Sequence, residues 1–360
     1  MTIPIRTFTP QEILTGNRNT RYYVDVLDSN DGFLERMDGV TDGSLDWVAN
    51  AMVKGGGQMT VRDVGFDPTD YLTLRFRPTM AIDGLPIQPL GIYVVSEAPE
   101  TWSNGRTWAV KLLDKSSILD QDIITTTYTV AAGTVVTTEV QNILNAAGLT
   151  CSISPSSKTA AGSMVWLPGA SKLRIINDLL QSIGYFALYM NFDGVLIGEP
   201  YLLPANRPTV YEFLDGANAI YQGDFGRDYD IWKIPNRVVV TGQGDGTTAA
   251  LTSSIDNTDP TSPYSIANRG RVIGYSEEGV EAADQTTLDA YAKRRLNELT
   301  NPTASVQIQH APIPGLAVNN VVRFRRTLAG IDAKHTVSKT SIVLKGDALA
   351  TSTLYQVVGL

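Results

Sequence analysis

The sequence Leu72-Thr73-Leu74-Arg75-Phe76-Arg77 opens the stretch that decides the fold. Apolar residues are interleaved with charged ones there and continue to Ile82, which predicts a β-strand. Turns at Asp83-Gly84 and Ser103-Asn104-Gly105 bound two further predicted strands, Gly91–Glu97 and Thr107–Asp114. These segments together predict a three-stranded antiparallel meander.

The same plan returns near the other end of the chain. Strands are predicted there at Val321–Arg326, His335–Leu344 and Thr353–Leu360. Arg323-Phe324-Arg325 echoes Arg75-Phe76-Arg77. One meander used twice predicts two similar β-domains in one chain.

Length and composition agree with a β-rich protein of several domains. A chain of 360 residues is too long for one core, so we expect about two to four domains. Only 18% of the residues are charged and 31 are glycines, which favours β structure with tight turns. The net charge of -8 disfavours a protein that grips nucleic acid by its surface, because acidic surfaces repel phosphate.

The cysteine count and the apolar runs set further expectations. Cys151 is the only cysteine, so no intrachain disulfide and no cysteine-based zinc site are expected, which is compatible with a reducing cytoplasm. Met1–Thr7 lacks the pattern of a signal peptide. No apolar run approaches the roughly 18 residues of a spanning helix, so no membrane-spanning segment is expected.

Residues 1–115 are predicted to be an N-terminal arm followed by a β-barrel that is closed or nearly closed, because closure hides strand edges. Besides the meander, its predicted strands are Tyr22–Leu27, Phe33–Val40, Trp47–Val53 and Met59–Arg62, with Gly55–Gly57 as a turn. The region from Trp47 to Arg62 also allows a short helix.

Residues 116–205 are predicted to be a small α+β domain. Val140, Ile143, Leu144 and Ala147 have helical spacing, and Gly148 is placed to end that helix. A second helix is predicted to begin at Ser171 and to end at Gly184. Strands at Tyr185–Met190 and Val195–Glu199, joined by a turn at Asn191–Gly194, complete the domain.

The second β-barrel is predicted to be discontinuous and to comprise residues 206–244 and 300–360. Its further strands are predicted at Val210–Phe213, Ala219–Phe225, Arg237–Thr241 and Val306–His310. Residues 245–299 are predicted to be an insertion of loop and helix. Residues 247–285 are rich in Thr, Ser, Asp and Pro and are expected to be loop, and Thr286 is expected to cap a helix with Asp289 in its first turn.

Two short motifs superficially resemble ligand-binding loops. Gly242–Gly246 looks like a phosphate-binding loop, but no helix start follows it, so a hairpin turn is favoured. Asp224, Asp228 and Asp230 could together bind Ca²⁺, yet the EF-hand spacing is missing, so a solvated turn is favoured. Binding of a cation by these three aspartates stays an open alternative.

Residues for catalysis are scarce. His310 and His335 lie in predicted strands and in neither case in a zinc-binding arrangement. No serine lies in a G-x-S-x-G context. We therefore assign no catalytic, cofactor-binding or metal-binding residue and expect no cofactor, although a pair of carboxylates that meet in space stays open.

The arginines of the two echoing strands have two interpretations. Arg75, Arg77, Arg323, Arg325 and Arg326 form either a solvated face with ion pairs to nearby acids or a subunit interface, where arginine is enriched.

Seven ordered segments resemble the tail hub, or minor tail, proteins of long-tailed bacteriophages. They are Gly43–Trp47, Pro89–Val95, Ile234–Val240, Asn257–Pro260, Glu277–Val280, Leu288–Ala292 and Pro314–Val322. The resemblance implies a fold with two tube-like β-barrel domains per chain and smaller insertions, which agrees with the duplicated meander.

The resemblance also implies a structural, non-enzymatic role in the virion. Such a chain would form a homotrimer whose six barrels adapt the sixfold tail tube and the distal tail protein ring to the threefold tip. It would carry the tip, central fibre or receptor-binding proteins, hold the tape measure C-terminus and line the channel that DNA passes without specific binding. Assembly would take place in the host cytoplasm.

Two other classes of function stay open. A carbohydrate-binding adhesin would group exposed aromatic residues on loops, whereas Trp102, Trp166 and Trp232 are scattered along the sequence. A glycan- or peptide-cleaving tail enzyme would need paired carboxylates in a cleft.

Overall fold

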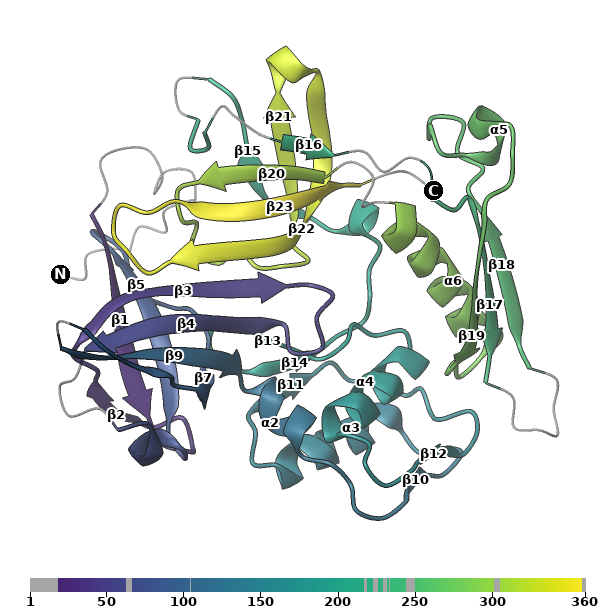
Figure 1. Ribbon diagram of the computed structural model, residues 1–360. Helices are drawn as coiled ribbons and strands as arrows, with labels where there is room; N and C mark the ends of the chain where they lie inside the picture. Colours follow the sequence, from purple (N-terminus) through teal and green to yellow (C-terminus); the bar gives the residue numbers. More distant parts are fainter. Residues whose placement is uncertain are drawn as a thin grey trace, which may run out of the picture.

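The chain folds mainly into β structure with a smaller helical part, so the fold class predicted from the sequence is confirmed. The computed structural model describes residues 19–62, 67–103, 105–216, 219–222, 226–228, 232, 234–243, 250–300 and 305–357. Four parts follow one another around four buried clusters of side chains: a first β region, a small α+β part, a second β region and an insertion within the second β region (Figure 1).

The first β region spans residues 20–114. Its elements are β1 (Thr20–Leu27), β2 (Phe33–Arg36), β3 (Val40–Val48), β4 (Gly55–Arg62), η1 (Pro68–Tyr71), β5 (Arg75–Ile82), β6 (Gln88–Pro89), β7 (Tyr93–Glu97), β8 (Glu100–Trp102) and β9 (Arg106–Asp114). They pair in the order β3-β4-β9-β7-β5-β1-β2. Alternate side chains such as Val110 and Leu112 of β9 fill the core.

The second β region contains β15 (Thr209–Phe213), β16 (Gly226–Asp228), β20 (Ser305–His310), β21 (Val321–Arg326), η4 (Thr327–Ala329), β22 (Ile331–Val343) and β23 (Ala350–Gln356). Hydrogen bonding links them in the order β16-β20-β23-β22-β21-β15. This order matches β3-β4-β9-β7-β5-β1 strand for strand. One difference is the last pair, because β15 runs parallel to β21 whereas β1 runs antiparallel to β5.

The pairing register extends this match to single residues. Val95 of β7 lies opposite Leu112, and Val337 of β22 lies opposite Leu354. Immediately after each valine the register shifts at a serine, Ser96 in one region and Ser338 in the other. The meander is therefore duplicated down to a β-bulge.

The Arg-Phe-Arg echo itself is two residues out of register. Phe76 pairs with Tyr93, whereas the residue that pairs with His335, the equivalent of Tyr93, is Val322 and not Phe324. A shift of two keeps the side chains on the same face of a strand, so the echo still marked the correct strands.

The small α+β part contains α2 (Ser116–Gln121), β10 (Tyr128–Val130), α3 (Val136–Ala146), β11 (Cys151–Ile153), β12 (Met164–Trp166), α4 (Lys172–Ser182), β13 (Tyr189–Met190), β14 (Leu196–Gly198) and η2 (Pro204–Asn206). The predicted helix ends are confirmed: Gly148 and Gly184 have positive φ after α3 and α4. Ser171 caps α4 by accepting a hydrogen bond from the Arg174 N–H. The strand predicted at Tyr185–Met190 is shorter, because Tyr185 makes only an isolated bridge to Pro200.

The insertion is a folded unit, so the prediction that residues 247–285 are loop is wrong for its described residues. It contains β17 (Arg237–Gly242), β18 (Thr252–Asp256), α5 (Ile266–Arg269), β19 (Gly274–Val280) and α6 (Gln285–Thr300). β17 was expected in the second barrel but pairs with β18 and β19, and α6 packs on this sheet. Buried Asn236 accepts from the Ile273 N–H and donates to the Arg271 carbonyl, so side-chain amides order this polar segment.

Three further local predictions are wrong: the strand to Val53, the turn at Gly55–Gly57 and the cap at Thr286. β3 ends at Val48, so residues 49–53 are a turn and not a strand, while Gly55–Gly57 are the start of β4 and not a turn. The cap of α6 is Asp284 and not Thr286, because its carboxylate accepts the Thr287 N–H at 2.6 Å. Of the strand predicted at Ala219–Phe225, Tyr221 makes an isolated bridge to His310, and residues 223–225 lie outside the described residues.

Candidate functional site at the joint between the two β regions

One strand joins the two β regions into a continuous sheet. The first half of β22 pairs with β21, and its second half, from Lys339 to Val343, pairs antiparallel with β3 (Figure 1). The Leu344 N–H continues the ladder by donating to the Gly43 carbonyl at 2.8 Å. The outer edge of β3 is thus covered by the second region.

The hairpin of β22 and β23 also contributes side chains to the first region. Ile342 and Ala350 are buried in the cluster that forms the core of the first region, and Leu344 packs against it. A Cβ on Gly346 would lie 2.3 Å from the Thr20 carbonyl oxygen, so the hairpin end directly abuts the start of β1. Such close approach requires glycine.

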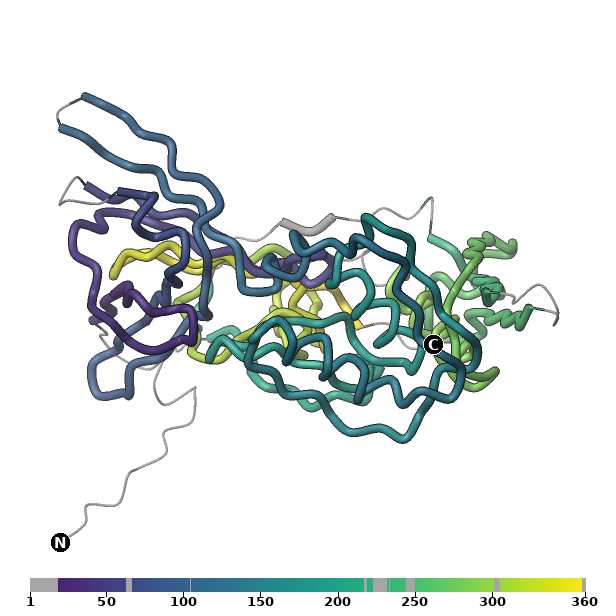
Figure 2. Tube along the Cα trace, turned by 90° about the horizontal axis from the view of Figure 1, so that it is seen from below, coloured from purple at the N-terminus to yellow at the C-terminus, as the bar shows by residue number. Residues whose placement is uncertain are grey.

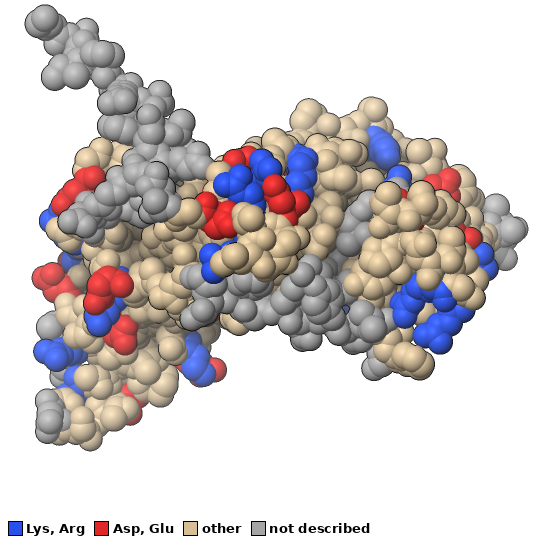
Figure 3. Space-filling view, turned by 90° about the horizontal axis from the view of Figure 1, so that it is seen from above, with Lys and Arg blue, Asp and Glu red and all other residues tan. Residues whose placement is uncertain are grey.

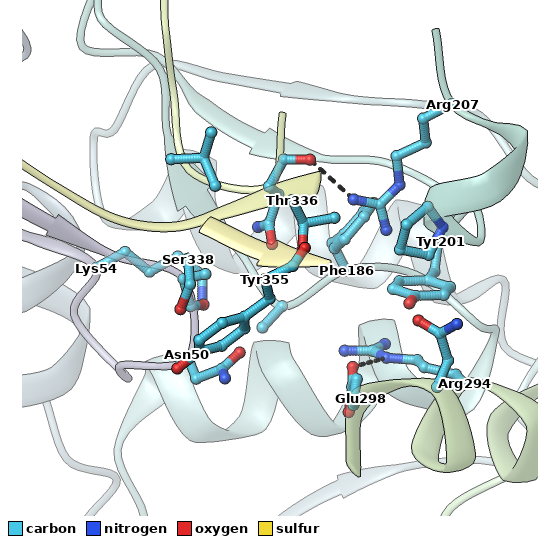
Figure 4. Close-up of a pocket in the computed structure, with 16 residues that line it drawn as sticks. Asn50, Lys54, Phe186, Tyr201, Arg207, Arg294, Glu298, Thr336, Ser338 and Tyr355 are labelled. Carbon is cyan, nitrogen blue, oxygen red and sulfur yellow. Dashed lines mark hydrogen bonds and ion pairs between the residues drawn. The ribbon is translucent and has the colours of Figure 1, made fainter. Parts of the chain in front are cut away.

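All four parts meet beside this joint in a pocket of about 80 Å³ (Figure 4). The lining residues include Asn50 and Lys54 of the first region, Phe186 and Tyr201 of the α+β part, Arg294 and Glu298 of the insertion, and Thr336, Ser338 and Tyr355 of the second region.

Lys54 lies buried at the first-region side of the pocket. Its Nζ donates to the carbonyl oxygens of Ala49 at 2.8 Å and Ala51 at 3.1 Å, which holds the turn between β3 and β4. Burial lowers the pKa of Lys54 to about 8, with a further contribution from Arg294. The ammonium therefore serves the turn that leads into the joint.

Two arginines enclose an aromatic pair on the other side of the pocket. The rings of Phe186 and Tyr201 lie 4.8 Å apart, with Arg207 4.8 Å from the Phe186 ring and Arg294 4.4 Å from the Tyr201 ring. Arg207 also donates to the Asn319 carbonyl at 2.9 Å, and Arg294 pairs with Glu298 at 2.7 Å (Figure 4). The charged groups thus bind the α+β part to the second region and to α6.

The carboxylate of Glu298 is kept ionised in this buried setting. Burial raises its pKa, but Arg294 and Arg295 outweigh burial and hold the pKa below its usual value. Arg294 also donates to the Tyr185 carbonyl at 3.1 Å. These contacts hold α6 against the α+β part of the chain.

A second charged cluster ties the first region to the α+β part. Asp31 accepts from Arg75 at 2.5 Å and from the fully buried Lys115 at 2.6 Å. Asp114 is also buried and accepts from the N–H groups of Gly55 and Ser116 at 2.6 and 2.8 Å. Lys115 and Asp114 directly precede α2, so these bonds fix the direction in which the chain leaves the first region.

The histidines singled out in the sequence are core residues. His310 Nδ1 lies 2.8 Å from the Ala311 carbonyl, which only accepts, and Nε2 lies 2.9 Å from Ser352 Oγ. Burial lowers the pKa of His310 to about 4, so the ring is neutral at pH 7. His335 is buried against Phe324, with its Nδ1 2.9 Å from the Ala333 carbonyl.

The two loop motifs fall largely outside the described residues. This applies to Asp224 and Asp230, while Asp228 ends β16. Gly242 ends β17, and Gly244–Gly246 lie outside. Over the ranges that the structure describes, no group of three or more His, Cys, Asp or Glu residues is arranged to hold a metal ion. No helix in those ranges is long and apolar enough to cross a membrane.

Four of the five arginines of the echoing strands pair with acids. Besides Arg75, Arg77 pairs with Asp25 at 3.2 Å, and Arg323 and Arg325 pair with Asp332 and Asp215 at 2.7 and 3.1 Å. Figure 3, a view onto the end where the β21–β22 hairpin lies, shows basic and acidic side chains side by side near the middle of that face. Ion pairs within the chain therefore account for these four arginines, but Arg75 is buried and does not lie on a solvated face.

No protein-family model matches the sequence, and no curated protein matches it. Solved structures do match. The tail protein from Neisseria meningitidis MC58 has a TM-score of 0.67 at 14% identity, with 93% of this chain and 96% of that chain covered. The 43 kDa tail protein of prophage MuSo2 from Shewanella oneidensis has a TM-score of 0.67 at 11% identity, with coverage of 94% and 98%.

A third match is the prophage tail protein gp18 from Listeria monocytogenes EGD-e, with a TM-score of 0.54 at 14% identity and coverage of 92% and 94%. The chain has the fold of phage tail proteins. The resemblance predicted from the sequence is thus confirmed at the level of the fold, over nearly the full length of these chains.

Proposed function

We propose that this chain is a structural component of a phage tail, a hub at the tail tip that acts without catalysis. The observation that carries the proposal is a fold shared over nearly the full length with phage tail proteins. This fold contains two β regions with the same strand order. Two equivalent regions per chain let three chains present six similar units, which suits a homotrimer that adapts a sixfold tube to a threefold tip.

The proposed location is the tail tip of the virion, after assembly in the host cytoplasm. There the trimer would contact the distal tail protein ring on one side and the tip, central fibre or receptor-binding proteins on the other, and would hold the tape measure C-terminus. DNA would pass through its channel without specific binding. The net charge of -8 supports this, because an acidic channel wall does not retain phosphates.

The contacts around the pocket support a structural role for it. Arg207 and Arg294 donate to the carbonyl oxygens of Asn319 and Tyr185, which lie in other parts of the chain, so their charges hold those parts in a fixed arrangement. Lys54 holds the turn between β3 and β4 that lines the same pocket. A ring needs such rigidity, because heterologous contacts close only when each chain keeps the same angle between its interfaces.

The test is electron microscopy and mass measurement of the purified full chain over a range of concentrations, alone and with a distal tail protein. We expect threefold rings with six β lobes and a channel of net negative surface. A chain that stays monomeric at high concentration and does not bind the tail ring would overturn the proposal. A channel lined by Lys and Arg would overturn its DNA-passage part.

A further inference from the structure

We infer that the hairpin formed by β7, β8 and β9 docks on the β16 edge of a neighbouring copy of this chain, as the β22–β23 hairpin docks on β3 within the chain. This inference rests on the proposed ring and names the contact that closes it. The partner is a second copy of the same chain, because the joint between β22 and β3 within the chain is an example of the same contact.

The two hairpins are equivalent by register. Both carry the Val-Ser bulge, at Ser96 and at Ser338. Counting on from the bulge, Glu100 corresponds to Ile342 and Trp102 to Leu344. The pairing of Glu100 with Trp108 in β9 agrees with this count.

The two hairpins differ in their surroundings. The β22–β23 hairpin lies on β3, whereas the hairpin of β8 and β9 projects away from the rest of the molecule (Figure 2). Ile342 is 5% exposed and Leu344 is partly buried, but their equivalents are exposed, Trp102 at 69%. Tryptophan is enriched among the residues that contribute most to protein interfaces, so Trp102 is placed to be covered on assembly.

The backbone of the projecting hairpin is oriented for strand addition. The Ala109 N–H donates to the Pro99 carbonyl, so Pro99 faces β9 and the alternate residues Glu100 and Trp102 turn their peptide groups outward. In the joint, the equivalent Leu344 donates outward to Gly43 of β3. Among the described residues, β8 pairs with β9 alone, so its outer edge is open to a further strand.

The acceptor edge is β16, which is the equivalent of β3. Ser44 of β3 pairs with Gln58, and Gly226 of β16 pairs with Gln307, the equivalent of Gln58. β16 is the terminal strand on its side of the large sheet in the described part of the chain. The joint pairs Val343 with Ser44, so the same register places Thr101 of one copy opposite Gly226 of the next.

Repetition of this contact closes a ring. Each first region receives the second-region hairpin of its own chain on β3 and gives its own hairpin to β16 of the next chain. The alternation uses one kind of contact six times in a trimer, and the interchain contact is heterologous, as a ring requires.

Cysteine cross-linking tests the predicted register. Thr101→Cys with Gly226→Cys is introduced in a Cys151→Ser chain, because Cys151 is the only native cysteine. Facing residues of a non-hydrogen-bonded antiparallel pair have Cα atoms about 4.5 Å apart, which is within disulfide range. We expect disulfide-linked dimers and trimers on a non-reducing gel.

Two matched pairs control the cross-linking. Val343→Cys with Ser44→Cys, the built joint, must give a cross-link within one chain that runs as a monomer. Thr101→Cys with Asp228→Cys, displaced by two residues on β16, must link poorly. Rings in which the joint pair links but Thr101 and Gly226 do not would overturn the inference and leave the proposed function standing.

A substitution that needs no cross-link gives an independent measurement. Trp102→Ala is expected to weaken trimer formation about tenfold or more, measured by mass photometry against concentration. Leu167→Ala is the matched control, since Leu167 is 71% exposed but lies in the α+β part. Both variants must keep the native melting temperature.

Equal trimerisation of the Trp102 and Leu167 variants would overturn the docking of this hairpin. If the native chain forms no trimer under any condition, the proposed function fails before the variants are compared. The two failures are therefore distinguished by the unmodified chain.

Discussion

Arg75 and Arg323 lie on corresponding strands of the two β regions but in different surroundings. Arg75 and its partner Asp31 have side chains only 9% and 17% exposed, whereas Arg323 and its partner Asp332 are 41% and 45% exposed. The first pair is covered because the α+β part begins beside it with Lys115. The repeat thus sets the path of the backbone, while the neighbouring parts of the chain set which side chains are buried.

The cores of the two regions differ in the same way. Val61 of β4 and His310 of β20 are equivalent by register, as are Gly57 and Val306. One region thus buries a polar ring where the other buries a methyl-bearing side chain. Substitutions at such equivalent positions measure how the surroundings of the two β regions differ.

The largest effect is expected from Asp31→Asn. Asparagine keeps the shape and tolerates the positive φ of 66° at this position, but it leaves Arg75 and Lys115 as buried cations without a counter-charge. Loss of one partner in a buried ion cluster costs about 3–5 kcal/mol. Urea unfolding followed by circular dichroism measures the loss.

Asp332→Asn is the matched control in the second region. Its exposed pair with Arg323 is worth less than about 1 kcal/mol. Equal losses from the two substitutions would contradict the difference in burial between the regions.

A medium effect is expected from the pH dependence that His310 imposes on stability. Its folded pKa of about 4 is below the unfolded value of 6.5, so the neutral ring is favoured by folding. The stability it contributes is present above pH 6.5 and is lost as pH falls towards 4. From about pH 8 to about pH 5 the loss is about 2 kcal/mol.

His310→Val, which gives the second region the residue of the first, is expected to remove this part of the acid dependence. The readout is the difference between native and variant unfolding curves at each pH, since carboxylates contribute to both. If the free energy of unfolding of the two proteins falls in parallel between about pH 8 and about pH 5, the pKa of His310 is not lowered by burial, and the prediction is contradicted.

The sequence predicted the strands of both meanders, the helices α3 and α4 of the α+β part and the fold class, because apolar periodicity and turn residues act locally. It did not predict the short helix α2. It missed β18 and β19, which are short and mostly polar, because buried Asn236 and Asn257 and packing on α6 order this part of the chain. Such partners are distant in sequence, so no local pattern reveals them.

The joint was missed for a related reason. The strand predicted at His335–Leu344 extends past its local partner, and only the tertiary structure shows that this excess pairs with β3. The pocket residues are likewise drawn from four parts that are distant in sequence, so no local pattern brings them together. The arginines were identified, but which of them is buried depends on the part that packs beside each strand.

An effect of about the same size as that of His310 is expected from Gly57→Ala, which probes why β4 begins with glycines where the sequence predicted a turn. A Cβ at Gly57 would lie 2.3 Å from the Ser44 carbonyl oxygen and 2.8 Å from Leu45 Cδ2, so β3 and β4 would have to separate next to the joint. Overpacking of this kind costs about 1–3 kcal/mol. Gly162→Ala is the control, because a Cβ there meets no atom within 4 Å, and its melting temperature is expected to stay native. The second region carries Val306 at the equivalent position, next to β16. A Gly57→Ala chain as stable as the native chain would therefore contradict the prediction. It would mean that β3 accepts a side chain at this position as β16 does, and that the two regions pack more alike than the close contact at Gly57 indicates.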